Sequence, residues 1–259
     1  MSRTAPPAFS GLVLVSLGLF LYSRWSGGSL VYYINQRFAG LILATAVGLV
    51  LVGLRLARQP RAHGHDPSCN HSHEPGHSHD HSHHGWGALL LLVLPMVLGL
   101  AVPARPLGAS AMAGREIHLG GVGLGSTSVA FERRLRGPLA DKTIVDWLYA
   151  FQTAEDKQSL LDEEVDVVGF VYRDAQLLGQ DATADDFFVS RFILSCCVAD
   201  ASPVSLMVRW QGAAKLESDA WVRVKGRLTV VDRLGRPLPL VEASSVVTVT
   251  APTQPYLYP

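Results

Sequence analysis

The stretch FAGLILATAVGLVLVGL, residues 38–54, contains no charged residue and is bracketed by Arg37 and Arg55. A helix needs roughly 20 predominantly apolar residues to cross the hydrocarbon core of a bilayer. This stretch comes close to that length, so it predicts a transmembrane helix. It decides the fold class of the N-terminal part of the chain, which we expect to be helical and embedded in a membrane.

Two further uncharged stretches flank it, AFSGLVLVSLGLFLY at residues 8–22 and WGALLLLVLPMVLGLAVP at residues 86–103. Buried core helices of a soluble protein are the alternative, but three such runs would leave little polar surface in residues 1–104. We predict a multi-pass protein of the cell membrane, with spans near 8–23, 38–54 and 86–103. The first span lacks the strongly basic start and small-residue cleavage site of a signal peptide.

The arginines near these spans predict the orientation, because cytoplasmic flanks carry an excess of Lys and Arg. One set of flanks holds the N-terminal amine, Arg3, Arg55, Arg58 and Arg61; the other holds Arg24, Arg37, Arg105 and Arg115. The excess of one charge favours a cytoplasmic N-terminus and an extracytoplasmic C-terminal domain.

A histidine-rich loop, residues 58–85, separates the second and third predicted spans and holds nine of the ten histidines. Imidazole is a common metal ligand near neutral pH, while the glycines, prolines and serines oppose a packed core. We expect the loop to bind zinc or another divalent transition metal; a solvated, pH-responsive linker is the alternative. The predicted ligands are His63, His65, Cys69, His71, His73, His77, His79, His81, His83 and His84.

None of the three spans contains a charged residue or a histidine. Ion pathways through membranes usually need ionisable groups at depth. The chain is therefore not expected to transport an ion by itself.

Residues 105–140 are rich in Gly, Ala and Ser and predict a linker, within which His118 is expected to be incidental. The string LGGVGLGS, residues 119–126, lacks the Gly-Lys-Ser/Thr of a phosphate-binding loop.

The stretch TIVDWLYAFQ, residues 143–152, predicts a helix, because its large apolar residues are spaced to lie on one helical face. We expect Asp141 to cap this helix.

A soluble, mainly-β domain is predicted over residues 141–259. Its five strands are expected at Val165–Tyr172, Phe187–Cys197, Val204–Trp210, Trp221–Val231 and Leu238–Thr250. Five short strands, two of them with an internal glycine, favour a small OB-like barrel with one flanking helix; a β-sandwich is the alternative. The net charge is zero, so no nucleic-acid partner is expected.

The string SRFILSCCVADASPV, residues 190–204, carries the most informative chemistry of this domain. If a strand continues to Cys197, alternation places Cys196 in the core and Cys197 toward solvent. Cys197 and Asp200 would then form a soft metal or redox site, whereas the alternative is that each cysteine is a small buried hydrophobe. The chain has no Gly-x-Ser-x-Gly or His-Glu-x-x-His motif, and no enzymatic activity is expected.

The chain resembles the YcgQ-like family in four strings. They are SRFILSCCVADASPV at residues 190–204, GFVY at 169–172, WVRVKG at 221–226 and PYLYP at 255–259. Members are bacterial membrane proteins described as permease subunits, and they share a Cys-Cys-x-Ala-Asp signature and a domain of unknown function. The resemblance implies an accessory subunit beside a larger multi-span permease, with a link to zinc homeostasis. It also places Arg191, Cys196, Cys197, Asp200 and Trp221 in the family signature without assigning their roles.

We therefore expect a membrane-anchored accessory subunit that gathers or hands over a divalent transition metal, zinc first, for a permease. Its expected partners are that permease, the metal ion and the lipid bilayer. One alternative is a thiol-redox protein acting through Cys196 and Cys197, although the chain lacks a Cys-x-x-Cys motif. Another alternative is a structural assembly factor for a membrane partner.

Overall fold

The computed structural model describes residues 7–58, 86–121, 137–179, 182–233 and 235–258. The chain divides into two compact units: residues 1–31 with 36–104, and residues 32–35 with 105–259. Each unit is described by itself. The predicted ligands of the histidine loop, from His63 to His84, lie outside the described residues.

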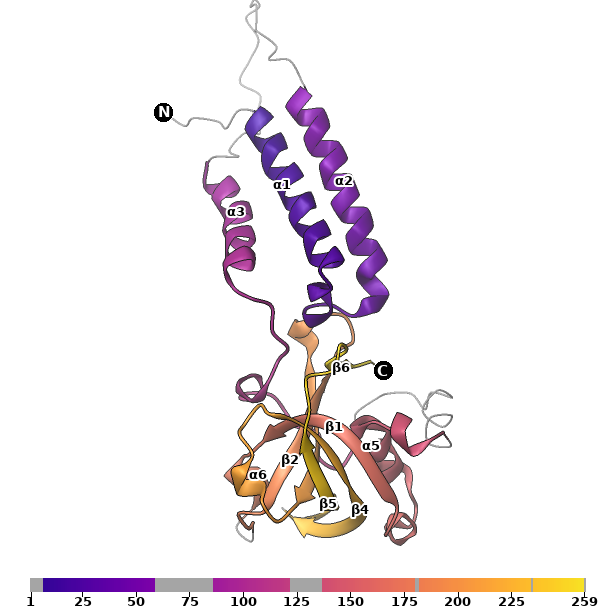
Figure 1. Ribbon diagram of the computed structural model, residues 1–259. Coiled ribbons are helices and arrows are strands. Elements are labelled where there is room, and N and C mark those ends of the chain that lie inside the picture. Colours follow the sequence, from indigo (N-terminus) through magenta and orange to yellow (C-terminus); the bar gives the residue numbers. More distant parts are fainter. Residues whose placement is uncertain (1–6, 59–85, 122–136, 180–181, 234, 259) are drawn as a thin grey trace, which may run out of the picture. The chain divides into compact units, whose positions relative to one another are not determined.

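The first unit is helical (Figure 1). Its helices are α1 (Pro7–Ser26), η1 (Ser29–Tyr32), η2 (Gln36–Phe38), α2 (Ala39–Arg58) and α3 (Trp86–Ala101). Two segments, Ala8–Ser26 and Gln36–Arg58, are long and apolar enough to cross a membrane, judged by length and composition. Two of the three predicted spans are therefore found. Helix α3 has only 16 residues, so the third span stays a prediction.

Helices α1 and α2 pack in antiparallel orientation through small residues. A Cβ atom built on Gly53 would lie 2.7 Å from the carbonyl oxygen of Gly11, and one built on Gly18 would lie 2.7 Å from that of Ala46. Between apolar helices in a bilayer, close backbone approach is a main source of association. The glycines therefore let the two helix backbones touch.

We expect Gly53→Ala to destabilise this helix pair by about 1–3 kcal/mol, because the new methyl group meets backbone atoms of α1. Gly48→Ala on the same helix is the matched control, since nothing lies within 4 Å of its Cβ position. Thermal unfolding of the full chain in detergent measures both variants. Equal melting temperatures for the two would contradict this packing.

The second unit is built on a sheet of β1 (Glu164–Tyr172), β2 (Asp186–Ile193), β3 (Ser202–Arg209), β4 (Trp221–Arg233), β5 (Arg236–Thr248) and β6 (Tyr256–Leu257). The first five correspond to the five predicted strands, with shifted ends. The short strand β6 was not predicted. Its two residues are too few to show an alternating pattern.

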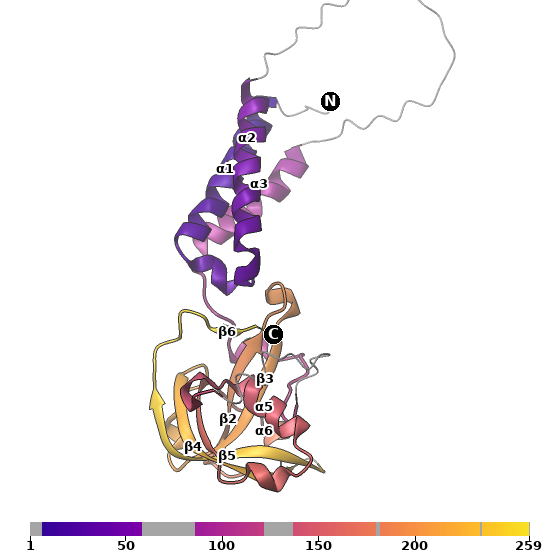
Figure 2. The same cartoon turned by 90° about the vertical axis from the view of Figure 1, so that its right-hand side faces the viewer.

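The strands belong to one sheet in the order β1-β4-β5-β3-β2-β6, and β1 pairs with β2 as well as with β4. This additional pairing closes β1 to β5 into a ring (Figures 1 and 2). Neighbours are antiparallel except for the parallel pairs β3–β5 and β2–β6. The predicted mainly-β domain is confirmed, and its single closed sheet differs from the two stacked sheets of a sandwich.

Two glycines permit this closure. A Cβ atom on Gly169 would lie 2.6 Å from the carbonyl oxygen of Ser190, and one on Gly226 would lie 2.2 Å from that of Glu242. At Gly226 the β4–β5 register shifts, so that Ser244 has no Cα partner in the ladder. Such a bulge bends and twists a strand pair.

Helix α5 (Ile144–Thr153) packs into the same hydrophobic core as the strands. The predicted apolar face is confirmed, because Ile144, Trp147, Leu148 and Phe151 are all buried. Thr143, not Asp141, caps the helix through a reciprocal capping box with Asp146. Asp141 instead belongs to a separate turn, η4 (Leu139–Asp141).

Short helical turns precede β1 or connect the strands of the second unit. They are η3 (Ala109–Ala111), η5 (Lys157–Leu160), α6 (Ala175–Leu178), η6 (Val198–Asp200) and η7 (Ala213–Lys215). Part of the predicted linker also packs on the ring, because Met112 and Leu119 are buried in its hydrophobic clusters.

Candidate metal centre

Cys196 and Cys197 lie in a loop rather than in a strand. Strand β2 ends at Ile193, so the alternation that predicted Cys196 in the core does not extend to the cysteines. That prediction is wrong: Cys196 is exposed and Cys197 is half-buried. We call residues 194–201, between β2 and β3, the Cys-Cys loop.

The side chain of Asp200 organises this loop. Its carboxylate accepts backbone hydrogen bonds from Ser195 (3.1 Å), Cys196 (2.6 Å) and Cys197 (3.2 Å). These N–H groups point inward to one acceptor, and therefore the chain turns here instead of continuing the strand. Asp200 follows Cys196 by four residues, and a carboxylate at this spacing indicates a turn. An argument from alternation alone overlooks that indication.

The same hydrogen bonds set the pKa of Asp200. Burial raises this pKa, but the hydrogen bonds from Cys196, Cys197 and Ser195 outweigh burial and lower it. Asp200 therefore stabilises the loop fully above the ordinary carboxyl pKa of about 4. This contribution is lost as the pH falls through the lowered value.

The two sulfurs and the carboxylate face one another. The Sγ atoms of Cys196 and Cys197 are 3.6 Å apart, and the ligand atoms of Cys196, Cys197 and Asp200 all lie within 4.8 Å of one another. Within the described ranges no other His, Cys, Asp or Glu cluster has such spacing. The structure thus brings together the predicted ligands Cys197 and Asp200 and adds Cys196.

The separation of the two sulfurs is compatible with a single shared metal ion. Two thiolates bound to one tetrahedral zinc ion at about 2.3 Å each lie about 3.8 Å apart, close to the observed separation. The hydrogen bond to Asp200, followed by that to Cys197, raises the pKa of the Cys196 thiol to about 12. At neutral pH this thiol carries a proton that an incoming metal ion must displace.

A segment from between α1 and α2 supports the loop from the other side. Asn35 donates from its backbone to Cys196 O (2.9 Å) and from its side chain to Ser195 O (3.0 Å). The Val198 backbone donates to Tyr33 O (2.9 Å), and Asn35 is only 3% exposed. Nothing in the sequence predicts this contact, because about 160 residues separate its two halves.

An open depression of about 480 Å³ lies beside the loop, lined in part by Asp200, Glu116 and His118. The Nε2 atom of His118 is 3.1 Å from Ser202 Oγ, and its backbone bonds to Pro203 and Ser205. His118 thus has a structural role at the edge of β3. The Arg115 guanidinium donates to Ala201 O and fixes the end of the loop.

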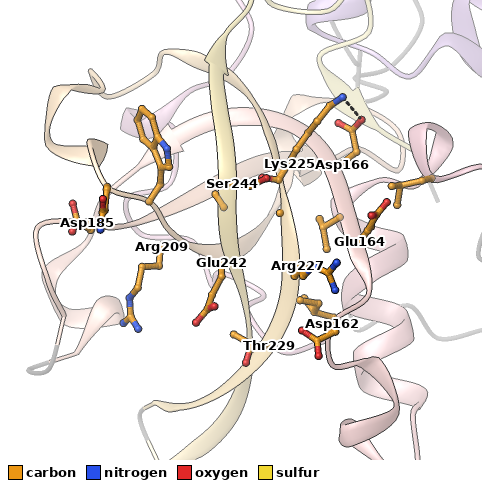
Figure 3. Close-up of a pocket in the computed structure, with 17 residues that line it drawn as sticks. Asp162, Glu164, Asp166, Asp185, Arg209, Lys225, Arg227, Thr229, Glu242 and Ser244 are labelled. Atoms are coloured by element: carbon orange, nitrogen blue, oxygen red, sulfur yellow. Dashed lines mark hydrogen bonds and ion pairs between the residues drawn. The ribbon is translucent and has the colours of Figure 1, made fainter.

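A different, open groove of about 1100 Å³ lies elsewhere in the second unit (Figure 3). Its charged lining residues are Asp162, Glu164, Asp166, Asp185, Glu242, Arg209, Lys225 and Arg227. Asp166 is buried and paired with Arg223 at 2.6 Å, and the bond to Arg223 is the main cause of its lowered pKa. The groove holds a structural ion pair and no thiol, so the Cys-Cys loop is the better candidate site.

Sequence comparisons agree with this architecture. The DUF1980 N-terminal domain matches residues 9–118, and the DUF1980 C-terminal domain matches residues 136–259. The chain belongs to the DUF1980 family. In this DUF1980 chain the first match covers α1 to α3, and the second covers α5 and the closed sheet with the Cys-Cys loop.

Two relatives of this DUF1980 chain carry descriptive names. It is 24% identical over 296 residues to "UPF0703 protein YcgQ" of Bacillus subtilis. This alignment covers 96% of this chain and 99% of the relative. It is 21% identical over 207 residues to a Streptococcus mutans protein named "Putative two-component membrane permease complex subunit", covering 65% of this chain and 72% of the relative. The predicted YcgQ-like family is thereby confirmed. No solved structure matches the chain.

Proposed function

We propose that this DUF1980 chain is a membrane-anchored, non-enzymatic accessory subunit of a permease, and that its Cys-Cys loop binds a soft divalent transition metal, zinc first. The name of the Streptococcus mutans relative supports the first part. The second part rests on one observation, the 3.6 Å separation of Cys196 Sγ and Cys197 Sγ beside the Asp200 carboxylate.

Three ligands leave a tetrahedral ion with one open position. An ion held in this way can be passed to another set of ligands, which suits a subunit that hands its metal to a partner. The histidine loop remains a predicted collector of the same ion. Thiol-redox turnover is less favoured, because the raised pKa of Cys196 suppresses the reactive thiolate.

The strand order supports an OB-like barrel as the fold of the second unit. The cyclic order is β1-β2-β3-β5-β4, and β3 and β5 form its parallel pair. A closed five-stranded Greek-key sheet of this kind is the architecture of OB folds. Here the Cys-Cys loop connects β2 to β3.

The contacts of residues 32–35 support three membrane crossings. If α1 and α2 both cross, these residues and the segment after α2 lie on opposite sides. Residues 32–35 form one unit with the β domain, with a bridge between Ile34 and Cys197. The chain must then return between Arg58 and Arg105, and α3 is the apolar helix in that interval.

Cysteine labelling tests this topology. In a chain whose three native cysteines are replaced by serine, we expect Ser218→Cys and Tyr33→Cys to react with an impermeant maleimide from the same side in whole cells. Ser68→Cys should react only after the membrane is opened, because the excess of one positive charge favours an extracytoplasmic Ser218. Labelling of Ser68→Cys and Ser218→Cys from one side would contradict a third crossing.

Copurification tests the function itself. The tagged full chain is isolated from native membranes in mild detergent, and the copurifying membrane protein and the bound metal are determined. We expect a multi-span partner in stoichiometric amount and metal that decreases in the Cys196→Ser/Cys197→Ser variant while the partner is retained. A chain that purifies alone would exclude the subunit role, and an unchanged metal content would exclude the metal role of the loop.

A further inference from the structure

Arg191, on the side of β2 that faces the C-terminal segment, is a half-buried cation without an anionic partner among the described residues. Its Nε donates to Pro255 O (3.1 Å) and its Nη2 to Gln254 O (2.5 Å). Among the described residues it forms no ion pair. Burial lowers the pKa of Arg191 to about 10, so the guanidinium is still charged at neutral pH.

A second polar group beside it, the Tyr258 hydroxyl, has no hydrogen-bond partner among the described residues. The hydroxyl of Tyr258 is buried, and no hydrogen-bond acceptor or donor reaches it within the described part of the chain. Buried polar atoms without partners are rare in folded proteins and call for an explanation. A ligand that accepts from both groups would provide one.

Both residues line the same cavity of about 320 Å³, which is within the size range of small-molecule pockets. Its other lining residues are the apolar Val145, Pro252 and Leu257 and the polar Thr143, Gln254 and Tyr256. The pocket therefore combines one cation, one free hydroxyl and an apolar surface. It shares no lining residue with the Cys-Cys loop, so it is independent of the proposed metal centre.

The donor pattern selects the chemistry of the ligand. A guanidinium has five N–H donors in a fixed fork, and two of them serve the backbone carbonyls of residues 254 and 255. The edge of the guanidinium that carries Nη1 remains available to a ligand. Two parallel N–H groups on such an edge match the two oxygens of a carboxylate. A phosphate dianion would keep an uncompensated charge in a pocket with one cation.

We propose that this pocket binds the carboxylate of a small organic acid with a short apolar body. Arg191 holds the carboxylate oxygens through its free Nη edge, Tyr258 donates a further hydrogen bond, and the apolar body contacts Val145, Pro252 and Leu257. The Trp221 ring, 5.8 Å from the Arg191 Cζ atom, keeps the guanidinium in position.

Calorimetry and thermal unfolding of the full chain in detergent test this pocket with butyrate, benzoate, inorganic phosphate and the neutral amide butyramide. We expect saturable binding of the two carboxylates and none of butyramide. Tyr258→Phe should weaken butyrate binding about tenfold, the size of one hydrogen bond to a charged acceptor. It should leave the melting temperature without ligand unchanged, because the hydroxyl has no partner to lose.

Tyr172→Phe is the matched control, since the Tyr172 hydroxyl bonds to Asp174 outside this pocket, and it should bind butyrate normally. Arg191→Lys keeps the charge but lacks the fork, so it should bind more weakly than the unaltered chain. The proposal is overturned if butyramide binds as well as butyrate, if phosphate binds better, or if neither acid binds at millimolar concentration.

Discussion

Replacing both Cys196 and Cys197 by serine is expected to abolish the sulfur-to-cobalt charge-transfer band of the chain loaded with Co²⁺. Each single replacement should remove about half of the band, because the 3.6 Å sulfur separation lets both thiolates bind one ion. The measurement uses the full chain with Cys69→Ser, so that the pair supplies the only thiols. Imidazole ligands of the histidine loop give no such band.

The serine variants should lose metal binding without losing stability. Both cysteines lie in a loop, and Cys196 is exposed, so the serine variants should unfold at the same temperature as the parent chain. Asp200→Asn serves as a third variant, in which the band persists at weaker affinity. A band that survives in the double variant, or a single variant that behaves as the parent, would contradict a shared ion.

The band should also depend on pH in a defined direction. The hydrogen bond to Asp200 raises the pKa of Cys196 to about 12, so this thiol must lose a proton when the metal binds. Affinity for Co²⁺ should increase by about tenfold per pH unit for each proton displaced between pH 6 and 8. An affinity that is constant over this range would mean that Cys196 is not a ligand.

The second large effect is expected at Gly226. A methyl group there would lie 2.2 Å from Glu242 O and 2.7 Å from the Ala243 Cα atom. Both are backbone atoms of the paired strand β5 and cannot move aside without breaking the ladder. Gly226→Ala should therefore destabilise the closed sheet by at least about 3 kcal/mol, a large part of the stability of a typical domain.

Protease resistance of the second unit and circular dichroism measure this effect in the full chain. Lys225→Ala is the matched control, because this neighbour is exposed and contributes a 3.6 Å ion pair to Asp166. A 3.6 Å contact from an exposed lysine contributes little, up to about 1 kcal/mol. A Gly226→Ala chain as resistant as Lys225→Ala would show that the bulge does not determine closure.

The elements themselves could be predicted because their patterns are local. Alternation and β-branched residues mark β1 to β5, and the spacing of Ile144, Trp147 and Leu148 marks α5. Ring closure is harder to foresee, since it depends on close backbone approaches at Gly169 and Gly226. A glycine in a strand indicates that another backbone comes close, but it does not indicate which strand that backbone belongs to.

The candidate site was predicted in part for the same reason. The proximity of Cys197 and Asp200 follows from their spacing of three residues, but the role of Cys196 depends on where β2 ends. That end is set by the Asp200 hydrogen bonds and by the Asn35 segment, which comes from between the first two predicted spans. Side-chain capping and long-range pairing of this kind leave no periodic trace in a sequence.

X-ray absorption spectroscopy at the zinc edge tests the central claim, that Cys196 and Cys197 together hold one metal ion, most directly. The sample is the full chain with Cys69→Ser and with the loop histidines between residues 63 and 84 replaced by glutamine, loaded with one equivalent of Zn²⁺. The account predicts two sulfur ligands at about 2.3 Å and oxygen or nitrogen ligands at about 2.0–2.2 Å. A zinc shell with oxygen and nitrogen alone, or with one sulfur, would contradict it.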